Sequence, residues 1–145
     1  MIEVEEKIEK NRIAFYIKGT KILHREGGPA AEYFEGSKEW FFNGLLHRED
    51  GPAVEYVSRS KEWWVRGNLH RVDGPAIDRA DGRKEWWFDG FRHRENGPAI
   101  ISQDGYVQWW LNGMRYKREE WFESLTEDKK MKALFCDFFM SHGFK

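Results

Sequence analysis

The sequence has 145 residues but only one cysteine, Cys136. A disulfide needs two cysteines, so the chain can form neither an internal disulfide framework nor a cysteine-rich zinc site, and this usage fits a reducing compartment. Long apolar runs are also missing, because no stretch approaches the roughly 18 apolar residues of a membrane-spanning helix. Residues 1–12 are acidic and lack the apolar core of a signal peptide. These absences predict a soluble protein of the cytoplasm.

An excess of charge of either sign is absent as well. Lys and Arg number 24 and Asp and Glu number 25, which gives a formal net charge of -1. The two signs are finely interspersed, so no overall basic field attracts nucleic acid, and binding of nucleic acid is disfavoured. Aromatic side chains, in contrast, are abundant: they make up 17% of the chain and include eight tryptophans. These rings must form either a core or a binding surface.

The chain repeats itself with a fixed period of 23 residues. Four histidines, four Gly-Pro-Ala triplets and four tryptophans recur at this interval. The histidines are His24, His47, His70 and His93. The tryptophans are Trp40, Trp63, Trp86 and Trp109. Repetition at this length is typical of a stacked array in which each unit supports its neighbours.

Within each unit, polar and apolar residues alternate with period 2, as they do in β-strands. Unit two reads PAVEYV, then SRS, then KEWWVRG, and the next two units have Asp-Gly at the central turn. Asp-Gly between alternating segments predicts a two-residue hairpin turn, in which both residues have positive φ. One hairpin cannot bury its apolar face, so we expect one elongated antiparallel sheet of about ten strands.

The two ends of the chain depart from the repeat. Residues 1–19 resemble a degenerate hairpin with Phe15-Tyr16 near the position of the paired tryptophans, and residues 20–116 hold the four repeats. Residues 117–145 change to a helical pattern. We therefore expect a single domain over residues 1–145, mainly β, in which a C-terminal helix caps the last hairpin and protects an open edge of the sheet.

The C-terminal helix is expected to place an apolar stripe in the core. Its apolar residues follow the spacing i, i+3, i+4, i+7, i+8. They are Met131, Leu134, Phe135, Phe138 and Phe139. Ser124 and Glu127 could form a capping box at the start of this helix, and Gly143 lies just past its end.

The spacing from Trp64 to Gly67 to His70, repeated in the neighbouring units, resembles the MORN repeat, itself a 23-residue hairpin unit. The string KEWWVRGNLHRVDGPA resembles the LHRxDGPA arrays found in proteins of phages, giant viruses and bacteria. The resemblance covers residues 20–116 and departs from MORN after each His, where Arg replaces the family's Gly. It implies a scaffold or protein-binding role, membrane-apposed in some relatives, and as a setting a phage or bacterial inhibitor or antitoxin acting in the host cytoplasm.

The connector LHREDGPA, residues 46–53, has the polar groups of a metal or catalytic site. Equivalent histidines in successive units, however, lie two strand spacings apart, roughly 9–10 Å, whereas two ligands of one zinc ion lie within about 4 Å. A general acid or base needs one particular environment, but this connector recurs in nearly identical surroundings. We predict no metal, no cofactor and no catalytic residue. An enzyme would need the non-repeated His142, Tyr106 and Cys136 to cluster in a cleft.

We instead expect the connector to shape the return between hairpins. Its histidine would form a hydrogen bond across the connector, and its glycines would take unusual φ angles. These glycines are Gly51, Gly74 and Gly97. The arginine after each histidine has two open roles: a structural ion pair, with Glu39, Glu62, Glu85 or the connector acids, or contact with a partner.

Strand alternation places the repeat tryptophans on an apolar face and a second aromatic row on the opposite face, beside polar residues. Exposed Trp and Arg together are typical of protein-binding hot spots. The predicted partner-binding residues are Phe41, Trp64, Trp87, Trp110, Arg48, Arg71 and Arg94. The second aromatic row could also be a packed layer, an alternative that the sequence leaves open.

The expected function is that of a non-enzymatic module that binds and occludes a partner protein. One alternative is a sponge for a nucleotide signal, with Arg and Trp holding phosphate and base. Another is a scaffold apposed to a membrane, which the near-neutral charge disfavours. The oligomeric state stays open at this point.

Overall fold

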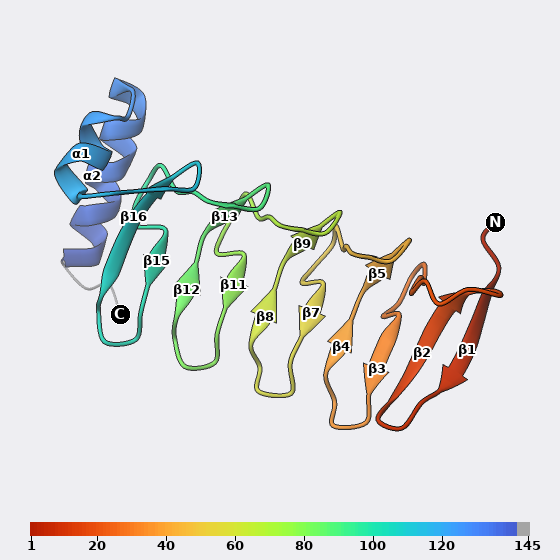
Figure 1. The fold of residues 1–145 in the computed structure, drawn as a ribbon. Helices are drawn as coiled ribbons and strands as arrows, with labels where there is room; N and C mark the ends of the chain where they lie inside the picture. Colours follow the sequence, from red (N-terminus) through yellow and green to blue (C-terminus); the bar gives the residue numbers. More distant parts are fainter. Residues whose placement is uncertain (142–145) are drawn as a thin grey trace.

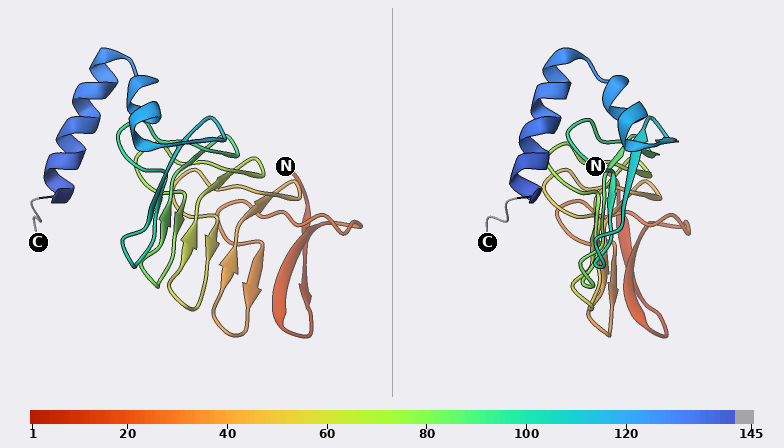
Figure 2. Two further views of the ribbon diagram at one scale, coloured as in Figure 1. Left: turned by 60° about the vertical axis from the view of Figure 1, so that its left-hand side comes forward. Right: turned by 90° about the vertical axis from the view of Figure 1, so that its left-hand side faces the viewer.

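The structure, a computed structural model, describes residues 1–141, with side chains described for residues 1–134. Its main element is an antiparallel sheet of eleven strands in the order β1-β2-β3-β4-β7-β8-β11-β12-β15-β16-β17. The strands follow one another almost in sequence order, which gives an elongated, single-layered molecule (Figure 1). The helices lie at the C-terminal end of the array (Figure 2). The expected hairpin array with a helical cap is confirmed.

Each repeat contains two hairpins instead of the expected one. The first hairpins form the long sheet: β3 (Ala31–Tyr33) with β4 (Lys38–Glu39), β7 (Val54–Glu55) with β8 (Lys61–Glu62), β11 (Ile77–Asp78) with β12 (Lys84–Glu85), and β15 (Ile100–Ile101) with β16 (Val107–Leu111). The second hairpins are β5 (Phe41–Phe42) with β6 (Leu45–Leu46), β9 (Trp64–Val65) with β10 (Asn68–Leu69), β13 (Trp87–Phe88) with β14 (Phe91–Arg92), and β16 with β17 (Met114–Tyr116). The N-terminal segment forms one further hairpin, β1 (Val4–Ile8) with β2 (Arg12–Ile17).

The two hairpins meet where the backbone changes partners. The N–H of Trp40 donates to the carbonyl of Ala53 in the next repeat, while its carbonyl accepts the N–H of His47 in its own connector. Trp63 and Trp86 do the same one and two repeats later. Each of these tryptophans therefore joins the hydrogen bonds of the long sheet to those of the second hairpin. The single continuous strand that the sequence predicted through this position is interrupted in the first three repeats.

The turns also differ from the expected ones. In repeat three the first hairpin closes with Gly82 N–H to Arg79 O and Arg79 N–H to Arg83 O, which encloses three residues. Gly82 has φ 91, whereas Asp81 is not among the residues with positive φ. This is a three-residue loop ending in a left-handed residue. The prediction of a two-residue Asp-Gly turn was wrong here.

The two-residue turns lie instead between the strands of the second hairpins. Both residues of each turn have positive φ, the signature of a type I′ turn. The pairs are Asn43-Gly44 (φ 49 and 80), Arg66-Gly67 (49 and 80), Asp89-Gly90 (46 and 81) and Asn112-Gly113 (49 and 79). The sequence had led us to expect these residues at the end of the second strand of each hairpin.

The core of the array is thin because no second layer covers most of the sheet. Its buried residues are small or β-branched side chains of the strands after each Gly-Pro: Ala30, Ala31, Ala53, Val54, Ala76, Ile77, Ala99 and Ile100. The array therefore depends on contacts between adjacent repeats.

Two helices, α1 (Arg118–Glu123) and α2 (Glu127–Ser141), follow the last hairpin. Trp121 of α1 packs on Trp109 with ring centroids 4.4 Å apart, and its indole N–H donates to the carbonyl of Arg94. Leu111, Leu125 and Ala133 complete this cluster. In the last repeat Trp121 thus occupies a ring face of Trp109 and secures the helical segment to the sheet.

The C-terminal segment differs from two of the expectations drawn from the sequence. Ser124 is the C-cap of α1 and its hydroxyl donates to Glu120 O, so the expected capping box with Glu127 does not form. Met131 and Leu134 are 56% and 50% exposed and do not belong to the core. The side chains of Phe135, Phe138 and Phe139, and residue Gly143, lie outside the described part of the chain.

Arg59 occupies a position that favours glycine. Its φ is 72, and the corresponding residues of the other repeats are Gly36, Gly82 and Gly105, with φ from 84 to 110. A left-handed conformation costs a non-glycine residue roughly 1–2 kcal/mol, part of which glycine loses again to unfolded-state entropy. We predict that Arg59→Gly raises the free energy of unfolding by about 0.5–1 kcal/mol in urea denaturation.

The reverse substitution is the matched control. A Cβ at Gly82 meets nothing closer than 3.8 Å, so only its φ opposes a side chain. Gly82→Arg should lower the free energy of unfolding by a similar amount. Equal stability of both variants and the parent protein would contradict this account of the turn.

Candidate interaction surface

The repeat histidines connect successive repeats. Each accepts at Nδ1 the backbone N–H of the first turn residue in the following unit's second hairpin. The bonds run from Asn43 to His24 (3.0 Å), Arg66 to His47 (3.2 Å), Asp89 to His70 (3.2 Å) and Asn112 to His93 (3.1 Å). An acceptor at Nδ1 implies a neutral ring with its proton on Nε2. The expected bond across the connector is therefore replaced by a bond between repeats.

His70 differs from the others in one respect. Its Nδ1 also lies 2.8 Å from Oδ1 of Asp89, whose N–H it accepts. A neutral ring accepts from the amide, whereas an imidazolium donates to the carboxylate, so one of the two contacts is made in each protonation state.

Two backbone bonds complete each junction. At the first, Gly44 N–H donates to Leu23 O (2.8 Å) and Arg25 N–H donates to Phe41 O (3.2 Å), and the same pair recurs at the other three junctions. Each connector thus binds the next turn at three points. The position of every second hairpin is set by the repeat that precedes it.

The connector arginines are held inside the array. Arg71 stacks on Trp63 with Cζ 3.9 Å from the ring centroid, donates from Nε to Asp73 (2.8 Å) and from Nη1 to Pro75 O (3.2 Å). A Cβ built on Gly74 would lie 3.0 Å from Arg71 Cζ, so the glycine closes the other side of the guanidinium. Equivalent stacks join Arg25 to Phe15, Arg48 to Trp40 and Arg94 to Trp86 at 3.8–4.1 Å.

This sandwich explains the connector glycines. Gly51, Gly74 and Gly97 are not among the residues with positive φ, so the expected unusual backbone angle was wrong. Their missing side chain instead leaves room for the arginine. The guanidinium, donating to the carboxylate, lowers the pKa of Asp50 and of Asp73. Of the acids proposed as arginine partners, the connector acids are confirmed.

The predicted partner-binding residues consequently separate into two groups. Arg48, Arg71 and Arg94 lie with the repeat tryptophans on the face that also carries the helices, which we call the back face. Phe41, Trp64, Trp87 and Trp110, the aromatic row, lie on the opposite face, the front face. The structure does not bring the two groups together.

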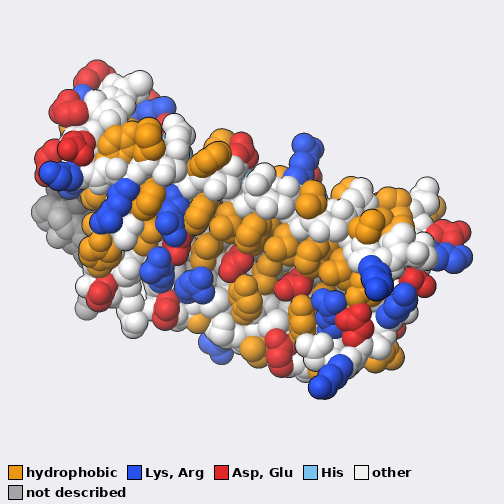
Figure 3. Space-filling view, viewed as in Figure 1, with side chains coloured by type: hydrophobic (Ala, Val, Ile, Leu, Met, Phe, Trp, Pro, Cys, Tyr) orange, Lys and Arg blue, Asp and Glu red, His pale blue; other side chains and the backbone are white. Residues whose placement is uncertain are grey.

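The front face carries a hydrophobic band along the array (Figure 3). The aromatic row contributes rings that are each half-buried. Across the second hairpins, the residues opposite these rings are Leu46, Leu69, Arg92 and Arg115. If each repeat advances the array by two strand spacings, the row spans roughly 30 Å. Helix α2 lies on the other side of the sheet from the face drawn in Figure 3, as the turned view shows (Figure 2).

Hydrogen bonds fix the orientation of the indoles. Trp64 Nε1 donates to Glu62 (2.9 Å), and Trp87 and Trp110 donate to Glu85 (3.3 Å) and Gln108 (3.0 Å). Each acceptor lies two residues earlier on the same face of the strand. Each indole therefore keeps a fixed ring orientation, and part of its surface stays exposed.

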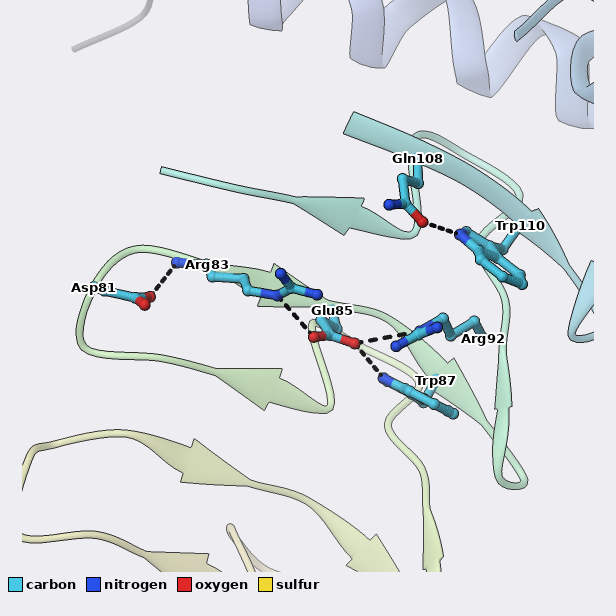
Figure 4. A network of polar contacts seen from close by, with 7 residues as sticks. All are labelled: Asp81, Arg83, Glu85, Trp87, Arg92, Gln108 and Trp110. Carbon is cyan, nitrogen blue, oxygen red and sulfur yellow. Dashed lines mark hydrogen bonds and ion pairs between the residues drawn. The ribbon is translucent and has the colours of Figure 1, made fainter. Parts of the chain in front are cut away.

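Glu85 is the centre of a polar cluster within this face (Figure 4). It is 4% exposed and accepts from Arg83 (2.9 Å) and Arg92 (3.4 Å) as well as from Trp87. Arg92 also lies between two rings of the row, 4.8 Å from the centroid of Trp87 and 5.2 Å from that of Trp110. A buried carboxylate paired with two guanidinium groups is well compensated.

Sequence reasoning missed Arg92 and the two leucines of the band. Each of them directly precedes a repeat histidine, a position that the sequence analysis assigned to the connector and not to a strand. The signal was the recurrence of Leu46 and Leu69 at the repeat interval, with Arg92 as the exception in repeat three. A strand assignment for these residues would have placed them opposite the aromatic row.

A pocket of about 920 Å³ lies on the back face between helix α2 and the connectors that follow repeats two and three. Its lining includes Arg71, Trp86, Arg94, Lys129 and other charged groups of both signs. Many of these groups form ion pairs within the lining, such as Lys129 with Glu95 (2.7 Å). The lining holds four cationic and three acidic side chains, so its formal excess of one positive charge selects only weakly for an anionic ligand such as a nucleotide.

The other candidate chemistries have little geometric support in the described residues. Residues 1–134 contain no group of three or more His, Cys, Asp or Glu side chains that could hold a metal ion. Tyr106 is 51% exposed and does not line the pocket of the back face, while the Cys136 side chain and His142 lie outside the described part. Neither helix within residues 1–141 is long and apolar enough to cross a membrane.

No protein-family model, curated protein or solved structure matches this chain. The geometry of the two faces is therefore the basis for any functional proposal.

The arginine sandwich predicts strong coupling between Arg71 and Gly74. Gly74→Ala in the parent protein should lower the free energy of unfolding by about 1 kcal/mol, because the new methyl displaces the guanidinium. Arg71→Ala alone should cost about 2 kcal/mol through the lost stacking and hydrogen bonds. In the Arg71→Ala background, Gly74→Ala should be neutral or stabilising, since its backbone angle suits alanine.

The measurement is a double-mutant cycle by urea denaturation. An interaction energy near zero would show that Arg71 and Gly74 do not depend on each other.

Proposed function

We propose that this protein is a non-enzymatic binding module that recognises another protein through its front face. The observation that carries the proposal is the aromatic row, whose rings are half-buried and whose three indoles are held in fixed orientations by acceptors on their own strands. Rigid aromatic side chains lose little conformational entropy on binding and dominate the energetics of protein interfaces.

The chemistry of the band favours a protein partner. Tryptophan, leucine and arginine alternate with acidic groups, a mixture that suits an interface with an apolar centre and polar margins. A single-stranded nucleic acid would also stack on such rings, but it needs a basic groove to follow its backbone. Here Glu62 lies directly beside the ring of Trp64, and its charge repels phosphate.

The architecture supports occlusion as the mechanism. A rigid single-layered sheet presents a long, slightly curved face (Figure 2) that covers a partner without changing shape. The resemblance to MORN repeats also implies a binding or scaffold role. It also supplies the proposed setting of a phage or bacterial inhibitor or antitoxin.

The connector arginines are left out of this binding surface. Arg48, Arg71 and Arg94 form hydrogen bonds with their connectors and stack on the repeat tryptophans, all on the back face. Arg92 takes their place at the front, between two rings of the aromatic row.

The test uses the intact chain as bait in a lysate of its native host, followed by identification of the captured protein and titration by calorimetry. We predict that Trp64→Ser combined with Trp87→Ser weakens binding at least tenfold, since central aromatic side chains of an interface are worth 2 kcal/mol or more. The back-face variant Val72→Ser, at a position that is 81% exposed, should bind like the parent protein.

Circular dichroism and urea denaturation must first show that both variants are folded. Unchanged affinity in a folded Trp64→Ser, Trp87→Ser protein would rule out the front face as the binding surface. Loss of affinity in Val72→Ser would move the surface to the back face.

A further inference from the structure

Strand β1 is a free edge of the eleven-stranded sheet. It has one neighbour, β2, and forms the end of the array opposite the helices (Figure 1). Glu9 N–H donates to Arg12 O and Lys18 N–H donates to Glu3 O, so the backbone groups of odd-numbered residues point toward β2. Because the direction alternates along a strand, the N–H and C=O groups of Val4, Glu6 and Ile8 point outward. Such a row is a template for another strand.

Two of the three side chains that β1 places on the back face are apolar as well as exposed. Val4 and Ile8 are 42% and 75% exposed and lie on the back face. Each is paired with a further aliphatic residue of β2, Val4 with Ile17 and Ile8 with Ile13. Two aliphatic rows therefore run across the hairpin and stop at its free edge.

We propose that β1 pairs with β1 of a second copy of this chain, antiparallel and across a two-fold axis at Glu6. In this register the Val4 of each copy lies opposite Ile8 of the other. The outward backbone groups of Val4, Glu6 and Ile8 then form three hydrogen-bonded pairs. The two sheets join into one continuous sheet, with the helices at its two ends.

The aliphatic rows are continuous in this arrangement. Ile13 and Ile8 of one copy are followed by Val4 and Ile17 of the other, and the symmetry axis generates the same row a second time. Cross-strand aliphatic pairs are the unit by which sheets are stabilised. The dimer thereby buries the two apolar side chains that the single copy leaves exposed at its edge.

The charges on the front face of β1 are complementary under the same symmetry. Glu5 of each copy lies opposite Lys7 of the other, so two ion pairs form across the interface. In the single copy these side chains pair along their own strand at 2.9 Å, and the Lys7 and Glu5 side chains are 49% and 33% exposed. The same two residues can therefore exchange partners at little cost.

Other registers satisfy fewer groups. A shift of one residue would set outward backbone groups against inward ones, which cannot pair. A shift of two residues toward the N-terminus would place Val4 against Glu6 and Glu5 against itself. The proposed register has one unfavourable contact, Glu6 opposite Glu6 at the axis, and like charges opposite each other weaken a sheet.

A two-fold contact also limits the assembly. Pairing of β1 with the other end of the array would repeat without closing and produce filaments, whereas β1 with β1 closes at two copies. The short interface predicts a reversible dimer whose population depends on concentration.

Sedimentation equilibrium of the full chain over a range of concentrations is the first test. The parent chain, of 17.4 kDa, should reach twice that mass and no more. Lys7→Glu replaces two attractive pairs by two repulsive ones and should raise the dissociation constant about tenfold or more. The double variant Glu5→Lys, Lys7→Glu restores complementary pairs and should regain most of the affinity.

Substitutions at the axis should act in opposite directions. Glu6→Gln removes the like charges and should strengthen the dimer, whereas Glu6→Pro removes the outward N–H and should abolish it while sparing the bonds to β2. Circular dichroism checks that each variant is folded. In a Cys136→Ser background, Glu6→Cys should form an intermolecular disulfide under mild oxidation, and Glu5→Cys should not.

A chain that stays monomeric at every concentration, or that grows beyond two copies, would overturn the proposal. So would a Lys7→Glu variant that dimerises like the parent chain. These results concern the edge of the sheet alone and are separate from the binding of a partner protein at the front face.

Discussion

The structure depends on the hydrogen bond between each repeat histidine and the turn of the next repeat. A single-layered sheet has no opposing layer to hold its strands in place, so its units must fix one another. The imidazole of His24, which is 1% exposed, accepts the Asn43 amide in a turn whose two residues both have positive φ. Such turns are tight and leave amides to be satisfied from outside. The histidine supplies that acceptor and thereby sets where the next hairpin begins.

The remaining features of the connector follow from this bond. With the histidine directed into the next unit, the arginine after it lies against the preceding tryptophan, as Arg71 does on Trp63. The glycine three residues later must then lack a side chain, because the guanidinium occupies that space. The polar residues of the connector thus form the internal support of the back face. The front face is left to the aromatic row, whose acceptors lie on the same strands.

The sequence alone predicted the architecture well and the connections less well. The 23-residue period and the alternation of side chains were enough for the hairpin array and for the opposite faces of Trp63 and Trp64. The turn types were wrong because Asp-Gly is compatible with both two-residue and three-residue loops, and only the closing bond between Arg79 and Arg83 decides. The role of Gly74 was missed because its neighbour in space, a folded-back arginine, is not visible in a pattern of alternation.

The most direct test of the connection between repeats is amide hydrogen exchange, measured by NMR, in the parent chain and in His47→Phe. The substitution keeps an aromatic ring but removes the acceptor for the Arg66 amide. The account predicts that exchange at Arg66 becomes at least tenfold faster, while the Asn112 amide, held by His93 two repeats away, keeps its protection. Unchanged exchange at Arg66 would contradict the claim that the histidines hold the array together.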